Sequence, residues 1–147
     1  MTDPQPAPPS HWAQAYVGLP YIMGVGECGH RAALVWRQVF GIEVGAAPAF
    51  GDMEAAERLI AAELAGPHWA RVGAPAEGCT VIMWKGERTA HVGVWVDGGV
   101  DGGVNGGHVL HCTRAEGMVL TPEGGLAAQG FRVWGFFRHR AAWAAAA

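Results

Sequence analysis

The sequence predicts an α+β domain in which N-terminal helices pack on an antiparallel sheet of about five strands. Three observations predict this class. Apolar residues recur at helical spacing in the first half of the chain and alternate with a period of two in the second half. Short Gly-rich segments separate the alternating runs, as is typical of neighbouring antiparallel strands. The 147 residues are enough for one domain with one hydrophobic core.

The first half contains three predicted helices, over residues 11–17, 28–40 and 52–64. The second begins at Cys28, directly after a Gly-rich turn, and Gly41 is expected to end it. Its apolar side chains share one face with Cys28, so this face should pack toward the sheet. Asp52 is the expected cap of the third helix.

The second half contains five predicted strands, over residues 79–84, 90–96, 108–113, 117–120 and 131–137. In the second strand His91 shares a face with Gly93 and Trp95, while valines fill the other face. A face of His, Gly and Trp is unusual for a core and suits a cleft, with Gly93 leaving space beside the imidazole. In the next strand His108 and His111 face opposite ways, so they cannot serve one site.

The two ends of the chain fall outside this domain, which we expect to span residues 11–140. Residues 1–10 are Pro-rich and predict a disordered leader, and the Ala-rich residues 141–147 are expected to fray. The N-terminus lacks the basic and apolar regions of a signal peptide, and no apolar run reaches membrane-spanning length. We therefore expect synthesis in the cytoplasm and no membrane insertion.

Charge and composition disfavour several classes of partner. The net charge is −3 and no cluster of Lys and Arg marks a phosphate-binding surface, so nucleic acid is not expected. The three cysteines are an odd number in a chain without a signal peptide, which argues against a disulfide framework. His111 and the adjacent Cys112 face opposite ways, so a zinc site is not expected. The Gly-rich residues 97–107 lack the acidic order of a calcium loop and predict a flexible hairpin tip.

Cys28 is the candidate nucleophile. A helix N-terminus lowers the pKa of a thiol through its dipole, and its unpaired N–H groups can bind an oxyanion. His91, on the sheet, is the candidate base. We interpret Cys79 and Cys112 as small buried hydrophobic residues. His30 lies about 200° around the helix from Cys28 and is expected at the surface.

These residues lie in segments that resemble the NlpC family of cell-wall peptidases, most of all its short form in phage tails. The resemblance covers roughly residues 12–139, and the order of Cys, His-Val-Gly and Leu-His is specific as a set. The segments that carry it are GLPYIMG (18–24), ECGHRAALVWRQVFGIEV (27–44), HWARVGAPAEGCTVIMWKGERTAHVGVWVDGG (68–99), HVLHC (108–112) and RVWGFFRH (132–139).

The resemblance implies a papain-like core with Cys28 as nucleophile, His91 as base and His111 as the polar residue that orients His91. Tyr21 would lie near the oxyanion site, where the backbone N–H of Cys28 would be the other donor. The implied activity is that of a cysteine peptidase, without metal or cofactor. Its substrate would be the peptide stem of peptidoglycan, often at the bond between D-glutamate and diaminopimelate. The implied partners are tail-tip or hub proteins of a phage virion, with cleavage during entry.

The chain departs from the family pattern around the expected cleft. His30 and Arg31 replace smaller or apolar residues after the Cys, Cys79 replaces an Asp, and the loop before Cys28 is shorter. Two alternatives therefore stay open. The domain could be a structural part of a tail tip with weak or no catalysis. It could also be an acyltransferase or amidase, because a covalent acyl intermediate can pass to acceptors other than water.

Overall fold

A six-stranded antiparallel sheet forms the centre of the structure, a computed structural model that describes residues 11–44, 53–97 and 106–141. The order across the sheet is β1-β6-β2-β3-β4-β5, and each neighbouring pair is antiparallel. The α+β class is thus confirmed. The strands are β1 (Trp69–Val72), β2 (Thr80–Lys85), β3 (Arg88–Val96), β4 (His108–Thr113), β5 (Gly117–Pro122) and β6 (Phe131–His139).

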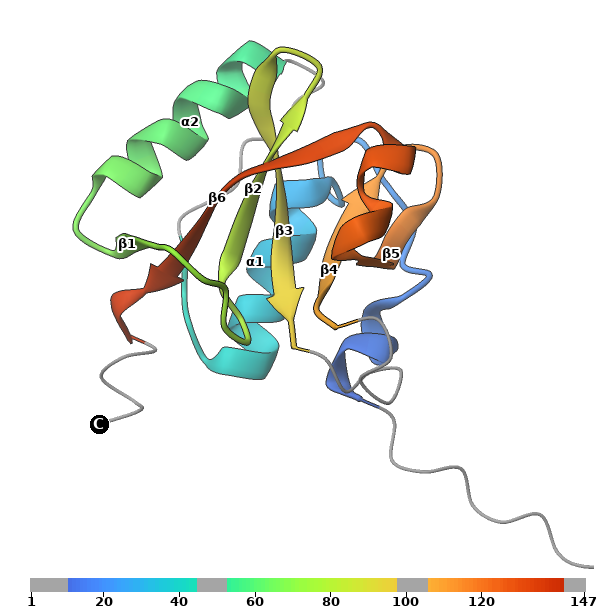
Figure 1. Cartoon of the computed structure of the whole chain (residues 1–147), viewed down its shortest axis with the longest axis horizontal. Coiled ribbons are helices and arrows are strands. Elements are labelled where there is room, and N and C mark those ends of the chain that lie inside the picture. Colours follow the sequence, from blue (N-terminus) through green and yellow to red (C-terminus); the bar gives the residue numbers. More distant parts are fainter. Residues whose placement is uncertain (1–10, 45–52, 98–105, 142–147) are drawn as a thin grey trace, which may run out of the picture.

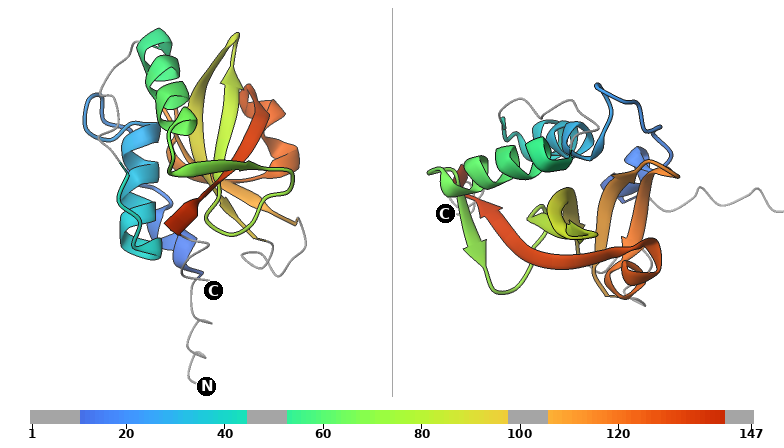
Figure 2. Two further views of the ribbon diagram at one scale, coloured as in Figure 1. Left: turned by 90° about the vertical axis from the view of Figure 1, so that its left-hand side faces the viewer. Right: turned by 90° about the horizontal axis from the view of Figure 1, so that it is seen from above.

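Both longer helices cover one face of this sheet (Figures 1 and 2). They are α1 (Cys28–Val35) and α2 (Met53–Ala65). The short helical turns η3 (Glu123–Gly125) and η4 (Ala127–Gln129) lie on the opposite face, before β6 (Figure 2). Two further short helices flank α1 in the sequence: η1 (Trp12–Tyr16) and η2 (Trp36–Phe40), the latter a turn of π-helix.

The structure corrects some of the predicted boundaries. The predicted helix over 28–40 is α1 followed by η2, and Gly41 ends it with a φ of 67°, as expected. The helix predicted over 11–17 is a 3-10 helix. The sequence did not predict β1, because this edge strand has only four residues and pairs with β6 alone. The expected cap Asp52, residues 1–10, 98–105 and 142–147 lie outside the described residues.

Two separate hydrophobic clusters occupy the two faces of the sheet. Beneath the helices, Val92, Val94 and Val96 of β3 pack with side chains of α1 such as Val35. On the opposite face, Trp95 packs with residues of β2, β4 and β6. The predicted division of β3 into a valine face and a second face is therefore confirmed.

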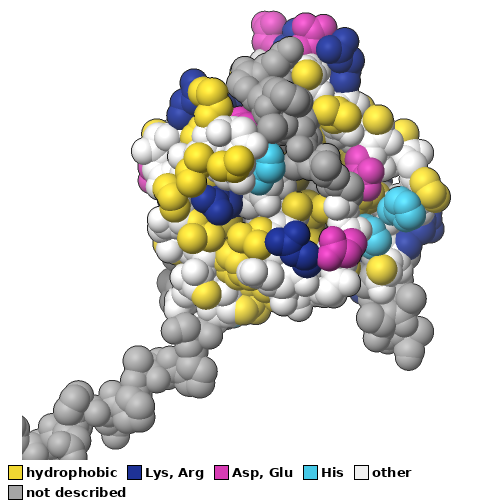
Figure 3. Space-filling view, turned by 180° about the vertical axis from the view of Figure 1, so that it is seen from behind, with side chains coloured by type: hydrophobic (Ala, Val, Ile, Leu, Met, Phe, Trp, Pro, Cys, Tyr) yellow, Lys and Arg dark blue, Asp and Glu magenta, His cyan; other side chains and the backbone are white. Residues whose placement is uncertain are grey.

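The face that the helices cover has a mixed surface. Figure 3 shows the molecule from behind, where basic and acidic side chains lie close to one another among hydrophobic ones. None of the helices in the described part of the chain combines the length and apolar character that crossing a membrane requires.

Candidate active site

A cavity of about 140 Å³ lies where the N-terminus of α1 meets β3. Cys28 from α1 and His91 from β3 both line it, together with Tyr21 from the loop before α1. His111 lies beyond His91, behind the cavity wall, and contacts it directly. The three side chains expected to form a catalytic set therefore lie in one region, although they are 63 and 20 residues apart along the chain.

Glu27 fixes the start of α1 and thereby the position of Cys28. Its buried carboxylate accepts hydrogen bonds from the Tyr21 hydroxyl (2.7 Å) and the Gly24 backbone N–H (3.1 Å). The same carboxylate caps the backbone N–H of His30. A single side chain thus joins the preceding loop to the first turn of the helix that carries the thiol.

The two unusual residues after Cys28 also hold this turn in place. His30 is partly buried, and its Nδ1 accepts the backbone N–H of Glu27 at 3.2 Å, which completes a reciprocal capping box. Arg31 donates from Nη2 to the Pro20 carbonyl at 2.6 Å. His30 therefore has a structural role at the helix terminus in addition to the surface position expected of it.

His91 is held between an aromatic ring and a second histidine. Its ring stacks on Phe131 of β6, with centroids 4.1 Å apart and planes at 17°. Its Nε2 lies 2.7 Å from Nδ1 of His111. Both histidines are almost fully buried, with exposed fractions of 3 % and 2 %.

Gly93 allows this histidine pair to form, but not by leaving open space as expected. It pairs directly with His111 across β3 and β4. A Cβ at Gly93 would lie 2.5 Å from Cγ1 of Val109 and 3.1 Å from Cβ of His111. The side chains of Val109 and His111 on β4 therefore occupy the space that a side chain at position 93 would fill. Without a side chain there, His111 can lie close enough to contact His91.

The hydrogen bonds behind His111 determine which nitrogens carry protons. His111 Nε2 lies 3.0 Å from Oγ1 of Thr121 and 3.2 Å from Oε1 of Gln129. An amide oxygen only accepts, so Nε2 of His111 carries the proton. Nδ1 of a neutral His111 is then an acceptor, and Nε2–H of His91 donates to it. This leaves Nδ1 of His91 as the unprotonated nitrogen, available to a thiol.

The pKa shifts keep both imidazoles neutral near pH 7. Burial lowers the pKa of His111 to about 4, against a weaker opposing effect of its hydrogen bond with Gln129. Burial also lowers the pKa of His91 well below its usual range, and nearby positive charge on His111 and Lys85 acts in the same direction. The neutral tautomers described above are thus the resting state of the pair.

The predicted lowering of the Cys28 pKa is wrong. Burial raises the pKa of this thiol, and the backbone N–H of Val92 and the charge of Lys85 offset only part of the effect. Desolvation of a thiolate outweighs the stabilisation that the helix terminus offers. Both shifts favour a neutral thiol at Cys28 and a neutral imidazole at His91, so a nucleophilic role of Cys28 would require proton transfer to a base.

Tyr21 lines the cavity, but its hydroxyl proton is already donated to Glu27. Burial and this neighbouring carboxylate raise the pKa of Tyr21. The oxyanion role expected for Tyr21 would require its hydroxyl to leave Glu27. The backbone N–H of Cys28, at the first helical position of α1, points out of the helix start and remains an expected donor.

Several residues of this site escaped sequence analysis. Thr121, Gln129 and Phe131 come from the segment after the recognised histidines, where no motif distinguishes them. Lys85 and Arg114 are exposed cationic residues that line the cavity. The one available signal was that Lys85 is the only lysine in the chain.

The expected structural roles of the two other cysteines agree with the geometry. Cys79 and Cys112 are both buried and reduced, and Cys112 Sγ lies 3.6 Å from the Gly26 carbonyl oxygen. Within residues 11–44, 53–97 and 106–141 there is no cluster of three or more His, Cys, Asp or Glu positioned to hold a metal ion.

The sequence matches no protein-family model, and no curated protein matches it at a significant level.

Proposed function

We propose that the protein is a papain-like cysteine peptidase that cleaves the peptide stems of peptidoglycan, within a phage tail tip. The observation that carries the proposal is the hydrogen-bonded series from Gln129 through His111 to His91, beside Cys28 in one cavity. A buried histidine pair whose outer member lines the same cavity as a cysteine is typical of a site that transfers protons.

The geometry supports a general-base mechanism. Nδ1 of His91 takes the proton of Cys28 as the sulfur attacks the substrate carbonyl carbon. The resulting oxyanion is stabilised by the backbone N–H of Cys28. The imidazolium of His91 then gives its proton to the leaving amine, and the C–N bond breaks to leave a thioester. Water, deprotonated by His91, hydrolyses the thioester and restores the thiol.

His111 supports each of these steps without touching the substrate. It accepts the Nε2–H of His91 at 2.7 Å and so holds the imidazole in the tautomer that exposes Nδ1. When His91 becomes an imidazolium, the same hydrogen bond becomes charge-assisted and strengthens.

The charges around the cavity support a substrate that carries carboxylates. Lys85 and Arg114 both line the cavity, and the Arg114 guanidinium lies 5.7 Å from the Tyr21 ring centroid. Neither forms an ion pair with another described residue. The peptide stem of peptidoglycan, which contains glutamate and often diaminopimelate, has carboxylates on both sides of its bonds.

Digestion of purified Gram-negative peptidoglycan tests the proposal. Wild-type protein and a Cys28→Ala variant are incubated with the same peptidoglycan, and released fragments are identified by mass spectrometry. We expect new peptide termini with the wild type alone, which would also identify the bond. No cleavage by either protein, with both folded by circular dichroism, would contradict the proposal and favour a structural tail component.

A further inference from the structure

A second cavity, of about 280 Å³, continues from the active-site cavity between the two helices. Gly29, Ile60 and Val92 line both cavities. Gly29 directly follows Cys28 and Val92 directly follows His91, so the shared wall is next to both catalytic side chains.

The second cavity extends along the helices away from the thiol. Its lining passes from Gly29 and Ala33 of α1 to Trp36 at the start of η2, seven residues or roughly 10 Å further along the helix axis. On α2, Met53 and Ala56 line the first cavity, whereas the second is lined by residues of the next turns, from Leu59 to Leu64. The two cavities therefore lie next to each other along the helices, and Cys28 lines the first.

The walls of the second cavity are largely apolar and aromatic. Trp36 and Trp69 meet edge to face, with ring centroids 5.2 Å apart. Ile82, Val92 and Leu64 complete the floor and side. Such walls suit an aliphatic chain, because burying its methylene groups against them is favourable.

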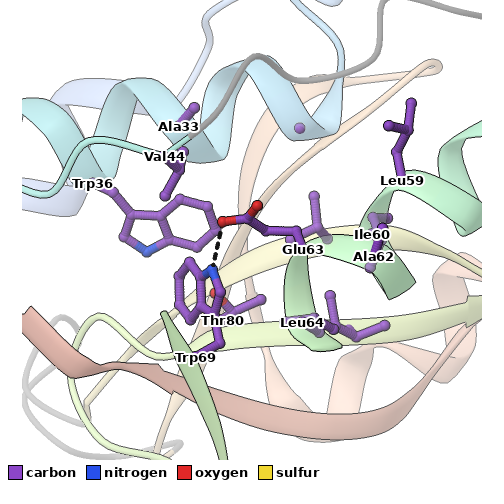
Figure 4. A pocket seen from close by; sticks show the side chains of 13 residues that line it. Ala33, Trp36, Val44, Leu59, Ile60, Ala62, Glu63, Leu64, Trp69 and Thr80 are labelled. Carbon is purple, nitrogen blue, oxygen red and sulfur yellow. Dashed lines mark hydrogen bonds between the residues drawn. The ribbon is translucent and has the colours of Figure 1, made fainter. Parts of the chain in front are cut away.

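Two oxygen acceptors interrupt this apolar lining. The Glu63 side chain points into the space between the two tryptophans, where Oε1 accepts Nε1–H of Trp69 at 3.2 Å (Figure 4). No described Lys or Arg forms an ion pair with Glu63. Thr80 also lines the cavity, is only 2 % exposed, and its hydroxyl has no hydrogen-bond partner. A buried hydroxyl without a partner is uncommon and indicates a group that a ligand could satisfy.

We infer that this cavity is a subsite for a substrate side chain that is aliphatic and ends in an ammonium group, as lysine does. Its methylene groups would lie against Trp36, Trp69 and Ile82. Its ammonium would donate to the Glu63 carboxylate and to Thr80, and would lie against the indole rings. An extended chain of five or six carbons is roughly 7 Å long, shorter than the roughly 10 Å of helix that lines the cavity from Gly29 to Trp36. That the ligand is a side chain of a substrate rests on the proposed function.

Binding of small amines tests the subsite independently of catalysis. The full-length protein, labelled with ¹⁵N, is titrated with n-hexylamine and with 1-hexanol, and the indole N–H signals of Trp36 and Trp69 are followed by NMR. We expect saturable shifts with both ligands and binding of the amine about tenfold tighter. In Glu63→Gln the advantage of the amine should disappear, whereas Glu123→Gln, which removes an exposed carboxylate away from both cavities, should keep it.

A steric variant provides the second arm. Ala33→Phe places a ring in the cavity and should abolish the shifts with both ligands, whereas Ala15→Phe adds the same ring at an exposed site and should not. The absence of saturable shifts in folded wild-type protein would overturn the inference, as would an unchanged amine preference in Glu63→Gln. Peptidoglycan cleavage without amine binding would refute the subsite alone. Amine binding without cleavage would refute the peptidase and keep the subsite.

Discussion

The two cavities on either side of Gly29, Ile60 and Val92 differ in what their polar groups are bonded to. In the first, His91 is bonded to His111, and Glu27 to Tyr21. Behind the cavity wall, His111 is bonded in turn to Thr121 and Gln129. In the second, the buried Thr80 hydroxyl has no partner, and the exposed Glu63 carboxylate bonds one indole. The polar groups of the first cavity are thus held by partners within the protein, as the proposed proton transfer requires, whereas the second has an unbonded hydroxyl beside a carboxylate.

The largest effect on cleavage is expected from replacing His91, the proposed general base. His91→Gln removes the nitrogen that accepts the thiol proton, so kcat/KM on peptidoglycan fragments should fall by about 10³-fold. Steady-state cleavage followed by chromatography measures it. The same change at His30, which caps α1 on the other side of the helix, should affect stability more than cleavage. Equal losses of kcat/KM in the two variants would contradict the assignment.

A pH effect on stability should come from the buried histidine pair. The folded-state pKa of His111 is about 4, below the value near 6.5 of an unfolded histidine, so the unfolded chain binds the proton first. The free energy of unfolding should therefore not depend on His111 above pH 6.5. It should fall as the pH drops from 6.5 toward 4, by about 3 kcal/mol, because the unfolded chain takes up a proton that folded His111 does not. Urea unfolding followed by tryptophan fluorescence, repeated across this pH range, measures the slope of the free energy of unfolding against pH. His111→Gln should reduce it, and an unreduced slope would refute the shifted pKa.

The pH dependence of Cys28 alkylation should reveal whether Cys28 and His91 already form a thiolate–imidazolium ion pair in the resting protein. Because burial raises the Cys28 pKa, alkylation by iodoacetamide should speed up as the pH rises through the alkaline range, with no plateau in the acidic range. Lys85→Met removes a cation that favours the thiolate and should slow alkylation at pH 8 by about threefold. Mass spectrometry of the labelled peptide measures both. A plateau below pH 6 would indicate a preformed thiolate and contradict the neutral pair.

The smallest effect is expected in the second cavity. Thr80→Val keeps the shape of the side chain and removes the hydroxyl that has no partner, so the free energy of unfolding should rise by about 1 kcal/mol. Thr121→Val, behind the first cavity, removes a hydroxyl that bonds His111 and Gln129 and should lower the free energy of unfolding by a similar amount. Chemical unfolding compares the two variants. If both variants changed the free energy of unfolding in the same direction, the distinction between the two hydroxyls would be refuted.

Much of the site could be predicted from the pattern of the sequence. Alternation along β3 predicted that His91 lies on the face opposite the valines, and alternation along β4 predicted that His111 and His108 face opposite ways, because a strand has a side-chain period of two whatever surrounds it. The Gly-rich turn and the apolar stripe after it predicted that a helix begins at Cys28 and that its stripe is buried. These are local properties, determined by residues within one element.

Other features depend on residues far apart in the chain. The pKa of Cys28 depends on how deeply the folded chain buries it, so the helix terminus alone predicted the wrong direction. The partners of His111 come from β5 and η4, and Phe131 reaches His91 from β6. The second cavity exists only because α1 and α2 lie beside one another on the sheet. The sequence by itself determined which side chains of one helix or strand share a face. Only the tertiary structure decided how deeply those side chains are buried and which partners they bond, because both depend on contacts between distant elements.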